Sequence, residues 1–189
     1  MKRITIVAAV FGAALLALAG VATAAPNAGV MCTDNSLAGQ TVMTNVTVPA
    51  NSTCDLSWAD VHGNVTVNGS LVTYGITHFG GNVQVNQGGS FAASNWGVTI
   101  DGNLSFLNPA TYSYNGFWGN QGGTSNLVKG NINYTITSGM QYPMYQSPLL
   151  YFGGGTHVNG NLNYSDQGTG FPGHLDTGGL TVGGHINVS

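Results

Sequence analysis

The stretch Val61-His62-Gly63-Asn64-Val65-Thr66-Val67 is followed 18 residues later by the related stretch Phe79-Gly80-Gly81-Asn82-Val83-Gln84-Val85. Both fit one frame: apolar, any residue, Gly, Asn, apolar, polar, apolar. The frame occurs seven times, at residues 42–48, 61–67, 79–85, 100–106, 128–134, 158–164 and 182–188, with Thr44 in place of Gly in the first copy and His185 in place of Asn in the last. Every apolar position of these copies holds an apolar residue or Tyr. Self-similarity over most of a chain is the signature of a repeat protein.

Consecutive copies begin 18 to 30 residues apart, which suits one turn of a solenoid. The alternation after the Asn predicts a strand with one buried face, and the apolar residue before the Gly predicts another strand. A corner is expected at Gly-Asn, because both residues tolerate a left-handed backbone. Pieces such as Gly69-Ser70-Leu71 and Gly89-Ser90-Phe91 are expected to close a third side. We therefore predict an all-β fold, a single-domain parallel β-helix of about seven turns, right-handed like nearly all parallel crossovers.

One side chain per copy occupies the Asn position, and stacked turns would bring these side chains into a column. Each amide in such a column can bond the next turn, so that burying it costs little. We interpret the column as a structural ladder. Its members are Asn45, Asn64, Asn82, Asn103, Asn131, Asn161 and His185.

The repeated frame resembles that of small exported bacterial β-solenoid proteins, in which Gly-Asn-Val-x-Val copies punctuate a right-handed parallel β-helix. The stretch 45–54 is similar to an opening that recurs in this group, and the resemblance extends from about Cys32 to the end. It implies a fold and no particular activity. The Asn column also resembles the ladder of the pectate lyase superfamily, but the Asp cluster and the Arg or Lys base of those enzymes have no counterpart here.

The first 24 residues have the pattern of a secretory signal peptide. A basic start, Met1-Lys2-Arg3, precedes the apolar run 4–21 and the small-x-small site Ala22-Thr23-Ala24. A retained membrane anchor is the alternative, because the run is close to the length that spans a bilayer. We expect cleavage, no transmembrane segment afterwards, and a secreted or cell-surface protein of a bacterium.

The two cysteines, Cys32 and Cys54, fit an exported protein, in which nearby cysteines usually form a disulfide. We divide the chain into the signal peptide at 1–24, a disulfide-containing segment with the first turn at 25–60, and the solenoid at 61–189. Two turns of this solenoid are longer than the others, with inserts at about 107–127 and 135–156.

Only 5% of the residues are charged, and the basic ones are Lys2, Arg3 and Lys129. A chain with so few cations cannot neutralise a phosphate backbone, so nucleic-acid binding is excluded as a function class. A helical bundle is disfavoured because Glu is absent and Lys is rare. The ordered recurrence of apolar residues argues against disorder.

Catalytic and metal chemistry find little support. A glycosidase needs two carboxylates that face each other, yet Asp60 and Asp101 fall two turns apart in different registers. No His clamp, second Cys pair or Gly-x-Ser-x-Gly elbow is present. We therefore expect no enzyme activity, no cofactor and no metal.

The two inserts are rich in aromatic residues, which suit stacking against sugar rings; the alternative is a hydrophobic cluster that packs the loops. The candidate ligand-binding residues are Tyr112, Tyr114, Phe117, Trp118, Tyr142, Tyr145, Tyr151 and Phe152.

The seventh copy has no polar cap after it, so we expect this solenoid edge either to pair with another molecule or to be capped by the inserts. The first alternative leads to the hypothesis of end-to-end association. The sequence thus predicts a structural or adhesive protein of the cell envelope that can associate with itself. The alternative is a carbohydrate-binding module that uses the aromatic inserts to hold a surface polysaccharide. A polysaccharide-active enzyme is the least favoured function.

Overall fold

The computed structural model describes residues 29–34, 37–94, 97–110, 114–118, 124–142, 148–153, 155–170 and 173–189. The predicted signal peptide lies outside these ranges. Every strand in the described part of the chain pairs in parallel, and no α-helix occurs there. Within the same ranges, no helix offers the length and apolar character needed to cross a bilayer. The predicted all-β class with parallel strands is confirmed.

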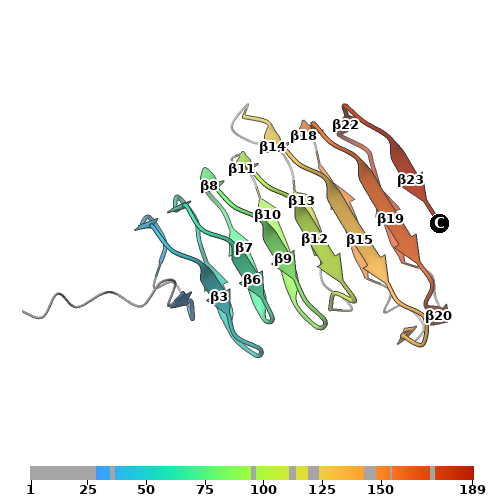
Figure 1. Ribbon diagram of the computed structural model, residues 1–189, viewed down its shortest axis with the longest axis horizontal. Helices are drawn as coiled ribbons and strands as arrows, with labels where there is room; N and C mark the ends of the chain where they lie inside the picture. The colour runs from blue at the N-terminus through green and yellow to red at the C-terminus, as the bar shows by residue number, and fades with distance from the viewer. Residues whose placement is uncertain are drawn as a thin grey trace, which may run out of the picture.

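Three long sheets contain most of the described strands (Figure 1). Sheet A contains β1 (Val30–Met31), β3 (Val46–Val48), β6 (Val65–Val67), β9 (Val83–Val85), β12 (Leu104–Leu107), β15 (Ile132–Ile136), β19 (Leu162–Asp166) and β23 (Ile186–Val188). Sheet B contains β4 (Thr53–Asp55), β7 (Ser70–Thr73), β10 (Ser90–Ser94), β13 (Tyr114–Trp118), β17 (Leu149–Phe152) and β21 (His174–Asp176). Sheet C contains β2 (Thr41–Val42), β5 (Asp60–Val61), β8 (Thr77–Phe79), β11 (Val98–Ile100), β14 (Asn126–Val128), β18 (Thr156–Val158) and β22 (Leu180–Val182). A short pair joins β16 (Gln141–Tyr142) to β20 (Thr169–Gly170).

The chain visits these sheets in the order C, A, B and then begins again. Each inner strand therefore pairs with its equivalents one pass earlier and one pass later; in sheet A, Val65 pairs with both Val46 and Val83. Successive passes follow one another along the long axis of the molecule (Figure 1). This is the arrangement of a parallel β-solenoid.

Apolar side chains from all three sheets fill the interior. In sheet A the first apolar residue after each Asn is at most 1% exposed from β3 to β19. In the B and C walls, Phe79, Phe91, Phe117 and Phe152 form a chain of ring contacts with centroids 5.8–6.3 Å apart. Burial of each such side chain stabilises the fold by about 1.5–3 kcal/mol.

The Asn column forms a ladder in which each amide bonds the next turn, but the amides lie in a different place from the one predicted. Each Asn Oδ1 accepts a hydrogen bond from the backbone N–H at the same position one turn later, at 2.8–2.9 Å. The column runs from Asn45 to the backbone N–H of His185. The side chains lie at the corner between sheets C and A and are partly or fully exposed. The prediction that these amides are buried is wrong, because the bend turns them away from the core.

The glycine before each Asn is required by close approach. A Cβ at Gly102 would lie 2.6 Å from Oδ1 of Asn82 and 2.8 Å from the carbonyl oxygen of Gly81. No described glycine or asparagine of these corners has a positive φ. The predicted left-handed backbone is therefore wrong, and contact with the preceding turn is what excludes a side chain.

The predicted disulfide between Cys32 and Cys54 is present, with both residues fully buried and their Cα atoms 5.5 Å apart. It ties the segment that precedes the first repeat to β4 of sheet B. Closing a loop of this length stabilises a fold by about 3 kcal/mol.

We predict that Gly102→Ala lowers the free energy of unfolding by about 1–3 kcal/mol, because the methyl group overlaps the preceding turn. Urea unfolding followed by circular dichroism measures this change. Gly80→Ala is the matched control, since its Cβ would lie 3.2 Å from the nearest atom. Equal effects of the two substitutions would contradict this explanation of the Gly column.

Candidate functional site

The outer face of sheet A carries one polar, uncharged side chain per turn. The backbone pairing keeps these residues in register from β3 to β23. Toward the later turns the side chains bond one another: Nδ2 of Asn163 donates to Oδ1 of Asn133, and Nδ2 of Asn187 donates to Oδ1 of Asn163, both at 2.8 Å. We call this surface the polar row; its members are Thr47, Thr66, Gln84, Ser105, Asn133, Asn163 and Asn187.

The outer face of sheet C carries a chain of charged groups from successive turns. His78 on β8 lies between two carboxylates: its Nδ1 is 2.8 Å from Oδ1 of Asp60 on β5, and its Nε2 is 3.2 Å from Oδ2 of Asp101, which follows β11. Lys129, which follows β14, places Nζ 2.8 Å from Oδ1 of Asp101. His62 adds a contact of 3.2 Å to Oδ2 of Asp60.

These contacts shift the ionisation of three groups. The hydrogen bond from His78 lowers the pKa of Asp60, and the hydrogen bond from Lys129, followed by that from His78, lowers the pKa of Asp101. The hydrogen bond to Asp60 raises the pKa of His78, against the opposing effect of partial burial. Both carboxylates thus stay ionised at neutral pH, whereas the general acid of a glycosidase needs a raised pKa.

The remaining three histidines, His157, His174 and His185, are exposed. Across the described ranges, His, Cys, Asp and Glu form no group of three or more placed to hold a metal ion.

The aromatic residues of the inserts divide into three groups. Phe117 and Phe152 are fully buried, so they pack the core. Trp118 and Tyr151 are half-buried and stack on each other, with ring centroids 4.4 Å apart and an interplanar angle of 20°. Tyr112 and Tyr145 lie outside the described residues, and only the backbone is described for Tyr114 and Tyr142.

Both inserts contain a strand of sheet B, β13 in the first and β17 in the second, and these strands pair with each other. The long turns therefore still contribute strands to sheet B, which encloses the third side of the apolar core.

Sequence reasoning missed an exposed apolar group at the corner between sheets B and C. Trp58, Tyr74 and Ile76 are 54%, 56% and 52% exposed. The flanking Thr73 and Thr77 are buried. The sequence contains the corresponding alternation of Thr73, Tyr74, Ile76 and Thr77. This inverted pattern, with polar residues inside and apolar residues outside, could have predicted the exposed apolar group.

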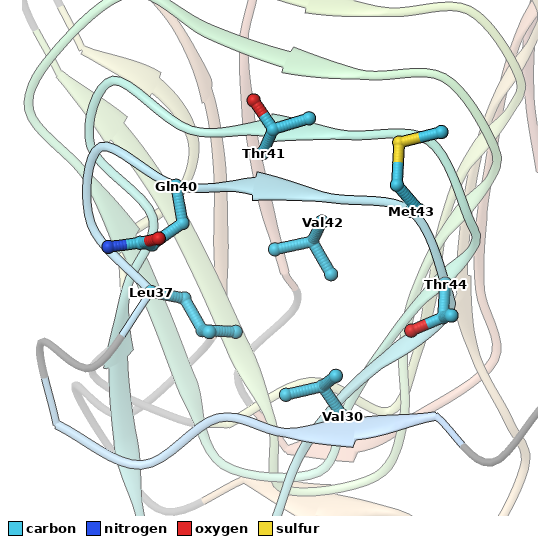
Figure 2. A pocket seen from close by; sticks show the side chains of 7 residues that line it. All are labelled: Val30, Leu37, Gln40, Thr41, Val42, Met43 and Thr44. Atoms are coloured by element: carbon cyan, nitrogen blue, oxygen red, sulfur yellow. The ribbon is translucent and has the colours of Figure 1, made fainter.

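A hollow of about 480 Å³ lies at the N-terminal end of the solenoid. Figure 2 shows Val30, Leu37 and Val42 pointing toward one another from three segments of the chain. Gln40, Thr41, Met43 and Thr44 complete its lining. At the opposite end, Ile186 and Val188 of β23 are 54% and 65% exposed.

Comparison of the chain with models of protein families, with curated proteins and with solved structures finds no match.

The charged chain on sheet C predicts a pH dependence of stability. A raised His78 pKa stabilises the fold below the ordinary value of about 6.5, and this contribution is lost as pH rises through the raised value. The pKa values of Asp60 and Asp101 are lowered in the folded protein, so these two groups stabilise the fold above about pH 4. Their contribution is lost as the pH falls through the lowered pKa values. The network should therefore stabilise the fold most between about pH 4 and about pH 6.5.

We expect His78→Gln to reduce the difference in unfolding free energy between about pH 5.5 and about pH 8.5. Urea unfolding at both pH values measures this difference. His157→Gln, which removes an exposed histidine of the same sheet, should leave the difference unchanged. A His78→Gln protein with the wild-type pH dependence would show that this network does not contribute.

Proposed function

We propose that the protein is an exported, non-enzymatic β-solenoid with a structural or adhesive role at the bacterial cell envelope. The polar row on sheet A carries this proposal. Its amides and hydroxyls repeat at roughly 4.8 Å, the spacing of adjacent strands, and they can match the repeated polar groups of an envelope polymer. The signal-like residues 1–24 support export, and the disulfide suits an oxidising compartment.

The number of domains, the number of turns and the handedness of the solenoid are part of the same proposal. We take the solenoid to be one domain with about seven turns and right-handed crossovers, since this hand is almost universal for parallel connections. Residues 25–60 comprise the disulfide-containing segment and the first turn, and residues 61–189 form the remainder.

The absence of catalysis is also proposed, on the chemistry of the two carboxylates that flank His78. Asp60 and Asp101 are both held ionised and paired by His78 and Lys129. Neither is suited to protonate a leaving group. Incubation with polysaccharides should release no reducing or unsaturated ends.

The alternative function, carbohydrate binding through the aromatic inserts, is favoured by one observation. Trp118 and Tyr151 stack and keep part of their rings at the surface of sheet B. Phe117 and Phe152 cannot take part, because the core encloses them.

Adhesion to the envelope is expected to resist salt, because the polar row and most of the outer surface lack charge. We predict that the purified protein sediments with isolated bacterial envelopes and stays bound in about 1 M NaCl, where charge contacts are screened. Protein reduced at Cys32–Cys54 and unfolded before mixing is the control. A native protein that remains in the supernatant would contradict the adhesive role.

Self-association is proposed through the two ends of the solenoid. The exposed Ile186 and Val188 at one end and the apolar hollow at the other are complementary in character. A head-to-tail contact between unlike surfaces does not close and produces linear assemblies.

Light scattering should therefore show a mass that rises with concentration, and Ile186→Asp should abolish the rise. Thr181→Asp, on the outer face of the neighbouring β22, is the control and should leave the assemblies intact. A constant monomer mass for the wild-type protein would contradict this part of the proposal.

A further inference from the structure

The corner between sheets B and C displays two exposed aromatic rings on a rigid frame. Trp58 follows β4, and Tyr74 follows β7 one turn later. More than half of each residue's surface is exposed, as is that of Ile76. We call Trp58, Tyr74 and Ile76 the corner platform.

The backbone of Trp58 is held in an uncommon conformation. Its φ is 64°, in the left-handed region that bulky residues rarely adopt. Strain of this kind costs about 1–3 kcal/mol and persists where the surrounding structure enforces it, often at functional sites.

The indole of Trp58 lies with one face on Gly75. A Cβ on Gly75 would be 2.4, 2.5 and 2.6 Å from Cε2, Cδ2 and Nε1 of the ring. Nearly equal distances to three bonded ring atoms place Gly75 beneath the ring face. The backbone of the second turn thus supports the ring, and 54% of the surface of Trp58 remains exposed.

Hydrogen bonds fix the supporting turns. Asp55 Oδ1 accepts from the backbone N–H of Ser57 at 2.8 Å and also from its hydroxyl group. The Ser57 Oγ in turn accepts from the backbone N–H of Tyr74 at 2.7 Å. Beneath them, the buried hydroxyls of Thr73 and Thr77 bond each other, and Thr77 donates to the carbonyl of Leu56 at 3.0 Å. The platform is therefore joined across two turns before any ligand arrives.

The chemistry of the platform selects its ligand class. The platform has no charged member, and Lys129, the one cation in the described part of the chain, pairs with Asp101 on sheet C. An anionic polymer therefore finds no partner here. A pyranose ring presents an apolar C–H face to an indole and hydroxyls at its edge, where a phenol such as that of Tyr74 can bond them.

We propose that the corner platform binds an uncharged polysaccharide by stacking a pyranose ring on Trp58. This inference rests on the proposed adhesive function, for which it names the class of partner. It places the site on the early turns and not on the aromatic inserts.

Trp58→Gly is the most informative variant. Glycine adopts a positive φ at no steric cost, so the substitution removes the ring and relieves the backbone. Gly75→Ala is the second variant: it keeps every aromatic atom, but its methyl group occupies the space beneath the indole. Leu107→Ala, which removes an exposed apolar side chain from β12 of sheet A, is the control.

The experiment is co-sedimentation of the purified protein with cellulose and chitin particles, with polygalacturonate gel as the anionic comparison. We expect the wild-type protein to bind the uncharged particles, and both Trp58→Gly and Gly75→Ala to weaken binding by about tenfold or more. Leu107→Ala should bind like the wild type. Urea unfolding should show that Trp58→Gly is at least as stable as the wild type.

Three results would overturn the proposal: no binding of the wild type to either uncharged particle, equal binding of wild type, Trp58→Gly and Gly75→Ala, or preference for the anionic gel. Loss of stability in Trp58→Gly without loss of binding would show that the ring only covers Gly75. Binding to whole envelopes distinguishes failure of the corner-platform proposal from failure of the proposed adhesive function. If Trp58→Gly still sediments with envelopes like the wild type, the adhesive role stands and the platform does not; if envelopes stripped of polysaccharide retain the wild type but not Trp58→Gly, the partner is a protein.

Discussion

The hydrogen bond from each corner N–H to the Asn Oδ1 one turn earlier sets the distance between successive turns. It repeats from Asn64 to His185 within 2.8–2.9 Å, although the turns differ in length by up to 12 residues. The strands that enter and leave the corner must then pair in parallel at a fixed register. The strands of sheet C end at this corner and those of sheet A begin there, so the inner and outer columns of both sheets depend on it.

The close approach at this corner explains the composition of the repeat. Gly is required because the preceding turn occupies the space of a Cβ, and Asn is favoured because its short amide reaches the next backbone N–H. The Oδ1 acceptor of each Asn is occupied by the hydrogen bond at the corner. The inward Val, Ile, Leu and Phe side chains stabilise the fold because they are buried away from water. Variation is tolerated elsewhere: both longer turns add residues between sheets A and B, and the first also adds residues between sheets B and C, but each returns to the same corner.

The sequence analysis located the corners, the strands that flank them and the disulfide, because each leaves a periodic or compartment-related signal. It could not tell that the Asn amides lie at the surface, since the same frame fits an inward or an outward bend. The aromatic composition of the inserts suited either sugar binding or loop packing, and it did not show that Phe117 and Phe152 lie on strands of sheet B that line the core. Side-chain contacts between neighbouring turns could not be predicted from the sequence either. His78 bridges Asp60 and Asp101 because strand pairing aligns three turns, and sequence spacing alone does not show this alignment. The exposed position of Trp58 depends on the conformation of a single residue, φ 64°, and on the small size of Gly75 in the next turn.

The corner ladder joins the turns of this parallel solenoid to one another. Amide hydrogen exchange measured by NMR tests it directly at the backbone N–H groups of Asn64, Asn82, Asn103, Asn131 and Asn161, whose side chains are largely at the surface. The account predicts slow exchange at all five, and selective acceleration at Asn103 when Asn82→Ala removes its acceptor. Fast exchange at these amides in the native protein would contradict it.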